Sequence, residues 1–152
     1  MIAIVRIRGL KNIQPEIRKT LETFNLDRKN HCVLVNVDEK DMALKKIQDY
    51  VAYGKVKTET MAKLIEKRGR LEGDKPIKVE TLKVHKLSTF NDLAHALSTG
   101  KITLKQVGIK KVFRLNSPKK GYGKIGIKKP VTLKGPLGFH PQGMDELLSA
   151  MM

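Results

Sequence analysis

The sequence is poor in residues that mark several common classes of protein. Its 152 residues include one cysteine, no tryptophan and 5% aromatic residues. Cys32 has no cysteine partner for a disulfide or a metal site, and it lies in an apolar run, which indicates a small buried side chain in a reducing compartment. No apolar run approaches the roughly 18 residues of a membrane span. Met1 leads directly into a strand-like segment rather than a secretory leader, so we expect a cytoplasmic protein.

Carboxylates are missing from residues 93–144, although that stretch contains eleven Lys and Arg. A segment of this kind cannot balance its own charge, so it requires an external polyanion, and we expect RNA or DNA. The formal net charge of the whole chain is +16 and its pI is about 10.0, as in many nucleic-acid-binding proteins. A solvated basic loop is the alternative interpretation, but it does not explain the missing acids.

The sequence offers no residues on which to build a catalytic or metal site. The four histidines are His31, His85, His95 and His140. None has a cysteine or a second histidine at metal-ligand spacing, and no Ser/His/Asp or Cys/His arrangement has a distinctive local sequence. We therefore expect a protein that is not an enzyme and has no cofactor, no metal and no small-molecule substrate. A basic enzyme acting on RNA stays open as an alternative.

Hydrophobic patterns in residues 1–58 alternate between strand and helix. Apolar and β-branched runs predict strands over 2–8, 32–37 and 51–56. Pro15 can open the first helix, and Asp38 can cap a second helix that presents Ala43, Ile47, Tyr50 and Val51 on one face. The expected order is β-α-β-α-β. No glycine-rich phosphate loop follows the first strand, which argues against a doubly wound nucleotide-binding fold.

Residues 59–152 are expected to form a helical extension with a basic loop, packed with this core. Thr58 can cap a helix that Gly69 ends, and a capping box of Thr89 and Asp92 predicts the next helix. A short strand over 112–115 leads into a Gly/Pro-rich segment, 117–143, and a last helix covers about 143–151. Two regions of the chain are thus expected, a core and an extension.

The sharpest binding pattern is the basic loop after residue 116. Its glycines allow close approach of the backbone to phosphate, its lysines displace counterions, and Tyr122 can stack on an unpaired base. A second phosphate-contacting edge could include Arg6, Arg8 and Lys11 with Arg18 and Lys19 of the first helix, although a solvated face explains these about equally well. Lys67 and Arg68 alternate with glutamates, so intrahelical pairing explains part of that cluster.

Six short segments, in order along nearly the whole chain, resemble one family. They are 6–9 (RIRG), 15–21 (PEIRKTL), 51–54 (VAYG), 64–69 (LIEKRG), 90–95 (FNDLAH) and 115–121 (LNSPKKG). The set resembles the ribosomal protein L-thirty family of the large subunit, whose longer eukaryotic member is called L-seven. This chain starts at the first strand without the long basic N-terminal extension of eukaryotic members, which indicates the archaeal type.

The resemblance implies an α+β fold with a three-stranded antiparallel sheet and two helices on one face, of ferredoxin-like character. It also implies a structural constituent of the large ribosomal subunit that acts in translation. Such a protein binds large-subunit ribosomal RNA near the five-S RNA and contacts neighbouring ribosomal proteins. A DNA- or chromatin-binding architectural protein is the alternative that shares the charge but not the resemblance.

The expected RNA-binding residues come from two sources. Those carried over by position are Arg6, Arg8, Lys11, Arg18, Lys19, Lys67, Arg68, Ser117, Lys119, Lys120, Gly121, Tyr122 and Lys124. Those added from the acid-free stretch are Arg114, Lys128, Lys129 and Lys134. Most of their contacts should be to phosphate and sugar, so that RNA shape determines specificity.

Overall fold

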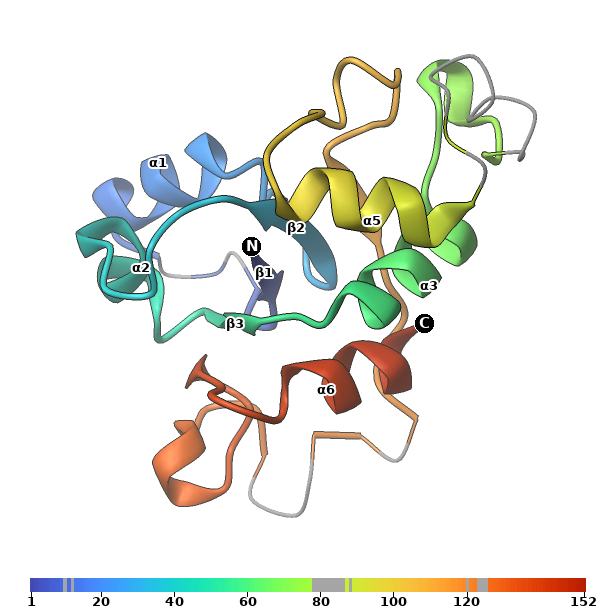
Figure 1. Ribbon diagram of the computed structural model, residues 1–152. Coiled ribbons are helices and arrows are strands. Elements are labelled where there is room, and N and C mark those ends of the chain that lie inside the picture. Colours follow the sequence, from blue (N-terminus) through green and yellow to red (C-terminus); the bar gives the residue numbers. More distant parts are fainter. Residues whose placement is uncertain (10, 12, 78–86, 88, 120, 123–125) are drawn as a thin grey trace.

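Strands and helices alternate in the N-terminal part of the computed structural model, in the predicted order (Figure 1). The structure describes residues 1–152 apart from 10, 12, 78–86, 88, 120 and 123–125. The elements are β1 (Ile2–Arg6), α1 (Pro15–Thr23), β2 (His31–Val35), α2 (Met42–Ile47) and β3 (Val51–Lys55). Pro15 begins α1, as predicted, because its missing N–H would have no partner in the first turn.

The start and end of α2 differ from the prediction. Asp41, not Asp38, caps this helix, and its Oδ1 accepts a hydrogen bond from the Ala43 N–H at 2.8 Å. Asp38 instead closes the preceding turn, where its carbonyl accepts the Asp41 N–H at 3.1 Å. The helix ends at Ile47, so Tyr50 lies beyond it and Val51 begins β3. The helical spacing of Tyr50 and Val51 was therefore misleading.

The extension contributes helices, turns and two short strands. They are α3 (Thr58–Arg68), the 3-10 turn η1 (Glu72–Asp74), α5 (Phe90–Ser98), β4 (Val112–Arg114), the 3-10 turn η2 (Val131–Leu133), β5 (Gly138–Phe139) and α6 (Met144–Met151). The predicted capping box is confirmed, with Thr89 and Asp92 each accepting the other's backbone N–H. Lys57, not Thr58, occupies the cap position of α3.

The sheet has five strands in the order β4-β2-β1-β3-β5. The β1–β2, β1–β3 and β2–β4 pairs are antiparallel, and β5 pairs with β3 in parallel. The fold is α+β, as expected, but the sheet is mixed and has two strands more than the resemblance implied. Both additional strands come from the extension, so the core and the extension share one sheet.

Helices cover both faces of the sheet, which gives three layers (Figure 1). Ile2 and Ile4 of β1 belong to the apolar cluster that includes residues of α1 and α2. Ala3 and Val5 face the opposite cluster, which includes residues of α3, α5 and α6. The two expected helices therefore cover one face, while the extension covers the other. This explains why every residue of β1 is buried instead of every second one.

Two positions in the sheet are tightly packed. A Cβ added to Gly54 of β3 would lie 2.3 Å from the His140 carbonyl oxygen, so only glycine fits there. Cys32 is buried as predicted, and burial raises the pKa of its thiol, which makes it unreactive.

Within the described residues, no helix is long and apolar enough to cross a membrane.

Candidate nucleic-acid interface

The topology brings three basic segments to one end of the sheet. Because β1 and β2 are antiparallel, and β2 and β4 also, the end of β1, the start of β2 and the end of β4 coincide there. Backbone hydrogen bonds join them, from the Asn30 N–H to the Arg6 carbonyl at 2.7 Å and from the Leu115 N–H to the Asn30 carbonyl at 3.0 Å. We call this region, residues 6–9, 11, 28–31, 115–119, 121 and 122, the basic end of the sheet.

Arg6 lies beneath this surface, not on it. Its side chain is 1% exposed, and its guanidinium donates to the backbone carbonyls of Arg8, Gly9, Leu26 and Asp27. Burial lowers the pKa of Arg6, an effect that the Asp27 charge opposes, although an arginine stays protonated at neutral pH. The expectation that Arg6 contacts RNA directly is therefore corrected: it joins the loops on either side of α1.

Arg8 is partly exposed and is held in a defined orientation. One guanidinium nitrogen donates to the Asp49 carbonyl at 3.1 Å, and the guanidinium lies 4.7 Å from the centre of the Tyr50 ring. A cation over an aromatic face is attracted by the ring quadrupole. The arrangement orders the side chain before any partner binds and leaves further N–H donors for a phosphate.

The remaining basic residues near α1 are exposed. Arg18 forms an ion pair with Glu22 at 3.0 Å, with both side chains more than half exposed. Such a pair contributes little in water and is readily exchanged for a phosphate. Lys11 and Lys19 are also exposed. Arg28 and Lys29 of the neighbouring loop are exposed too, and the sequence analysis did not single them out.

Asn30 connects the start of β2 to the basic loop. Its side chain accepts a hydrogen bond from the Tyr122 hydroxyl at 3.1 Å and donates to the Ser117 hydroxyl at 3.4 Å. Its backbone adopts a left-handed conformation with φ of +63°, which asparagine tolerates better than most residues. Sequence patterns did not identify Asn30, since its role depends on residues about ninety positions away.

Substitution of Tyr122 separates packing from base stacking. The ring is partly buried against the core, and burial raises the pKa of its hydroxyl. Tyr122→Phe should lower the free energy of unfolding by about 1 kcal/mol through the lost hydrogen bond, without weakening RNA binding. Tyr122→Leu should weaken RNA binding by about 1–3 kcal/mol if a base stacks on the ring. Denaturant unfolding and RNA titration of both variants measure these effects. Unchanged RNA affinity in Tyr122→Leu would show that the ring only packs.

The first residues of the basic loop are fixed to the C-terminal end of α6. The Asn116 and Lys119 N–H groups donate to the carbonyls of Met151 and Ala150, each at 3.0 Å, so the loop satisfies the last turn of that helix. The side chain of Lys119 is exposed, as are Lys128, Lys129 and Lys134. Gly121 makes a turn with φ of +71°. The predictions for Lys120 and Lys124 concern positions outside the described residues.

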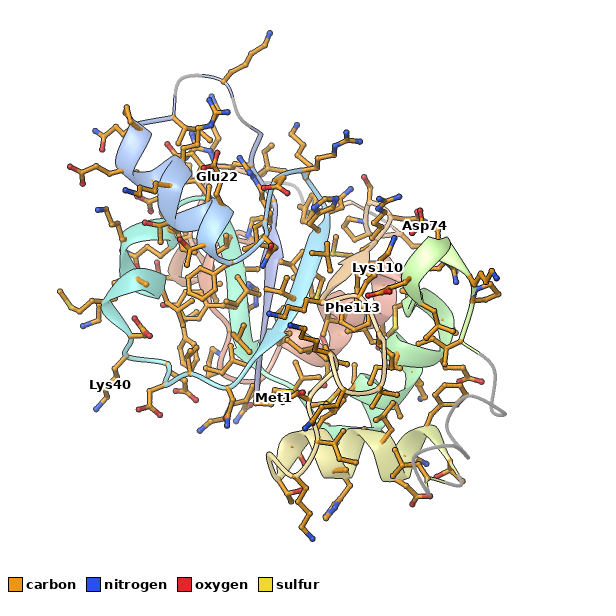
Figure 2. The ribbon with its side chains drawn as sticks, turned by 90° about the horizontal axis from the view of Figure 1, so that it is seen from above. Met1, Glu22, Lys40, Asp74, Lys110 and Phe113 are labelled. Carbon is orange, nitrogen blue, oxygen red and sulfur yellow. The ribbon has the colours of Figure 1, made fainter. Side chains whose placement is uncertain are left out.

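A second basic surface is a groove beside β4, with a volume of about 280 Å³. Its charged lining is Arg68, Arg70, Lys110, Arg114 and Asp74. Asp74 accepts a hydrogen bond from Lys110 at 2.6 Å and lies 3.9 Å from Arg114, and Figure 2 shows Asp74 and Lys110 next to each other. Arg68 and Arg114 were expected to bind RNA. Arg70 and Lys110 were not expected to bind RNA, because local sequence does not reveal the pairing of residues 70–71 with 109–110 that forms the groove. Lys67 is exposed on the last turn of α3 but does not line the groove.

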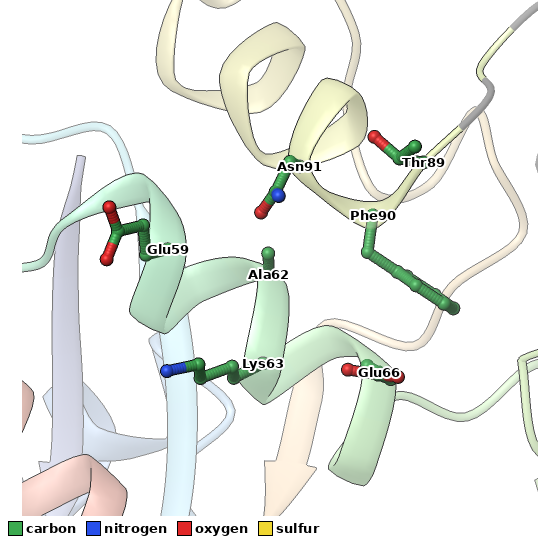
Figure 3. A pocket seen from close by; sticks show the side chains of 7 residues that line it. All are labelled: Glu59, Ala62, Lys63, Glu66, Thr89, Phe90 and Asn91. Atoms are coloured by element: carbon green, nitrogen blue, oxygen red, sulfur yellow. The ribbon is translucent and has the colours of Figure 1, made fainter.

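The pocket in Figure 3 has a different character. It lies between α3 and the start of α5, and its charged lining consists of Glu59, Glu66 and Lys63 beside Phe90. Two carboxylates and one ammonium are poorly suited to a phosphate backbone. Among the residues that the structure describes, no group of three or more His, Cys, Asp or Glu could hold a metal ion.

Comparison with known proteins gives one consistent result. Residues 2–51 match the family model Ribosomal protein L30p/L7e. The chain is 38% identical to the large ribosomal subunit protein uL30 of Methanococcus maripaludis over 151 residues, 99% of this chain and 98% of that protein. It is 37% identical to the Nanoarchaeum equitans uL30 over 149 residues, 97% of this chain and 96% of that protein. It is 41% identical to the Methanothrix thermoacetophila uL30 over 153 residues, 99% of each chain.

The family model covers β1, α1, β2 and α2 and ends at the first residue of β3. The archaeal relatives also cover the extension, which supplies β4, β5 and the helices of the second face. The relatives match essentially the entire length, with about two residues in five identical. This match shows that the chain belongs to the ribosomal protein L30p/L7e family.

Proposed function

We propose that this chain is a structural constituent of the large ribosomal subunit that binds and stabilises large-subunit ribosomal RNA. It is a non-enzymatic protein of a ribosomal family whose archaeal members span its full length. The observation that carries the proposal is the basic end of the sheet, where the topology brings the segments that carry Arg8, Lys11 and Lys119 to the same end. A surface whose segments are joined by backbone hydrogen bonds suits a folded RNA.

The residues proposed to contact RNA are the expected ones, with Arg6 removed. Their side chains contact phosphate and sugar, because lysine and arginine are charged hydrogen-bond donors. The base edges of A-form RNA are inaccessible in its narrow major groove. Arg6 contributes indirectly by holding the loop that carries Arg8 and Lys11. The protein then recognises the shape of an RNA fold, not its sequence.

Three finer features belong to the same proposal. The β-α-β-α-β part over 1–58 is a ferredoxin-like RNA-binding core, and 59–152 is an extension that packs on it. The protein lies near the five-S RNA and beside other ribosomal proteins in the cytoplasmic large subunit. The resemblance in sequence supports the location, while the alternation of strands and helices supports the fold comparison.

A competition experiment distinguishes this function from that of a DNA- or chromatin-binding protein. The purified chain is bound to labelled large-subunit ribosomal RNA at a fixed salt concentration, and unlabelled duplex DNA of equal phosphate content is added. We expect ribosomal RNA to compete far better than duplex DNA, since the surface fits a folded RNA. Equal competition by both would favour the DNA-binding alternative.

A further inference from the structure

We propose that the groove beside β4 binds consecutive phosphates of one RNA strand, and that Asp74 is its internal counter-ion. This inference rests on the proposed function, and it adds a second RNA-binding site to the one at the basic end of the sheet. The groove is lined by Arg68, Arg70, Lys110 and Arg114 around one carboxylate, a formal net charge of +3. Four cations in one concavity concentrate positive potential more strongly than the same charges spread over a convex surface.

Two stretches that are distant in sequence supply the four cations of the groove. Arg68 lies in the last turn of α3, and Arg70 follows that helix. Lys110 precedes β4, and Arg114 is its last residue. Two backbone contacts fix the segments: the Lys110 N–H donates to the Arg70 carbonyl at 2.9 Å, and Leu71 pairs with Ile109 in an isolated bridge. The cations are therefore positioned by the fold, and binding needs little rearrangement of the backbone.

Each arginine keeps donors available for a phosphate. One terminal nitrogen of Arg68 donates to the Met152 carbonyl at 2.7 Å, and one of Arg70 donates to the Gly69 carbonyl at 3.2 Å. A guanidinium has five N–H donors, so each of these bonds orients the group without saturating it. The Arg114 side chain is 75% exposed and stands 3.9 Å from Asp74.

Asp74 occupies the position that a phosphate oxygen would take. The hydrogen bond from Lys110 and the charges of Lys110, Arg114 and Arg70 lower the pKa of Asp74, so the carboxylate is ionised at neutral pH. The Lys110–Asp74 pair is largely exposed, with side chains 39% and 57% accessible, so a phosphodiester can displace it at little cost. The carboxylate thus orders the cations and weakens binding of arbitrary polyanions.

Asp74→Asn tests this role without changing the turn. Asp74 has a left-handed backbone with φ of +59°, and asparagine tolerates that conformation. We expect this variant to bind both ribosomal RNA and duplex DNA about 2- to 5-fold more tightly at low salt, with a reduced preference for RNA. Unchanged affinities would overturn the counter-ion role.

Removal of cations tests the groove itself. The double variant Lys110→Gln/Arg114→Gln is compared with Lys40→Gln/Lys45→Gln, which removes two exposed charges near α2, and Figure 2 shows Lys40 far from Lys110. The probe is purified large-subunit ribosomal RNA, titrated with the full chain across a KCl series. We expect the slope of log affinity against log salt to fall by about 1.4–1.8 in the groove variant and to stay nearly unchanged in the control.

The outcomes separate this inference from the proposed function. Equal slopes for the groove variant and the control, with strong RNA binding by both, would overturn the groove and leave the proposed function standing. Failure of the unaltered chain to prefer ribosomal RNA would overturn both. If the groove variant kept its salt slope but no longer joined the large subunit, the groove would bind an acidic protein, which also overturns the inference.

Discussion

Replacement of Arg6 by methionine is expected to lower the free energy of unfolding by about 3 kcal/mol. The methionine fills much of the volume, but it leaves the carbonyls of Leu26, Asp27 and Gly9 without the guanidinium donors. A buried acceptor that loses its partner costs about 1–3 kcal/mol, and more when the partner was charged. Urea unfolding followed by far-ultraviolet circular dichroism measures the difference, provided that the slope of the unfolding transition is unchanged.

Arg8→Met is the matched control for that experiment. Arg8 follows Arg6 by two residues and is only partly buried. Its guanidinium donates one hydrogen bond to a backbone carbonyl and makes one contact with the Tyr50 ring. We expect a loss of about 1 kcal/mol in stability and a clear reduction in the salt slope of RNA binding. The Arg6→Met variant, where it is folded, should keep the salt slope of RNA binding of the unaltered chain. Equal destabilisation of both variants, or a reduced slope in Arg6→Met, would contradict the assigned roles.

Substitution of Lys119, Lys120 and Lys124 by glutamine is expected to have the largest effect on RNA binding. Each lysine that contacts a phosphate releases counterions, so the triple variant should lose about 2.1–2.7 from the slope of log affinity against log salt. The Lys119 side chain is exposed, while its backbone is fixed to the end of α6. Filter binding or fluorescence titration with ribosomal RNA across a KCl series provides the measurement.

The control for the lysine experiment removes three charges elsewhere. Lys40→Gln/Lys45→Gln/Lys63→Gln changes exposed lysines of the α2 and α3 regions that are not among the proposed RNA contacts. The net charge falls equally, so a general electrostatic effect would alter both slopes alike. A slope that is lower in the loop variant alone supports direct contacts. If the two slopes were the same, the loop would not carry the direct contacts with RNA.

Local patterns were sufficient for most of the element order. Pro15 and the Thr89–Asp92 capping box mark helix starts by short-range chemistry, and both were predicted correctly. The choice between Asp38 and Asp41 could not be made in that way, since two similar residues stand close together and only the folded turn separates them. β5, with two residues, has no local pattern and exists because it pairs with β3.

The candidate site was predictable in its charge and not in its geometry. The absence of acids over 93–144 indicated a polyanion partner, and the family resemblance indicated RNA. The burial of Arg6 was missed because alternation suggests that one face of a strand is exposed, whereas helices here cover both faces of the sheet. The groove of Arg70 and Lys110 depends on contacts between residues forty positions apart, which no local pattern records.

Sedimentation with ribosomes tests the central claim most directly. The tagged chain is expressed in an archaeal host, and the lysate is separated on a sucrose gradient in high salt, where weakly bound basic proteins dissociate from ribosomes. Our account predicts that the chain sediments with the large subunit and stays there after duplex DNA has been digested. Recovery at the top of the gradient, or with DNA instead of the large subunit, would contradict it.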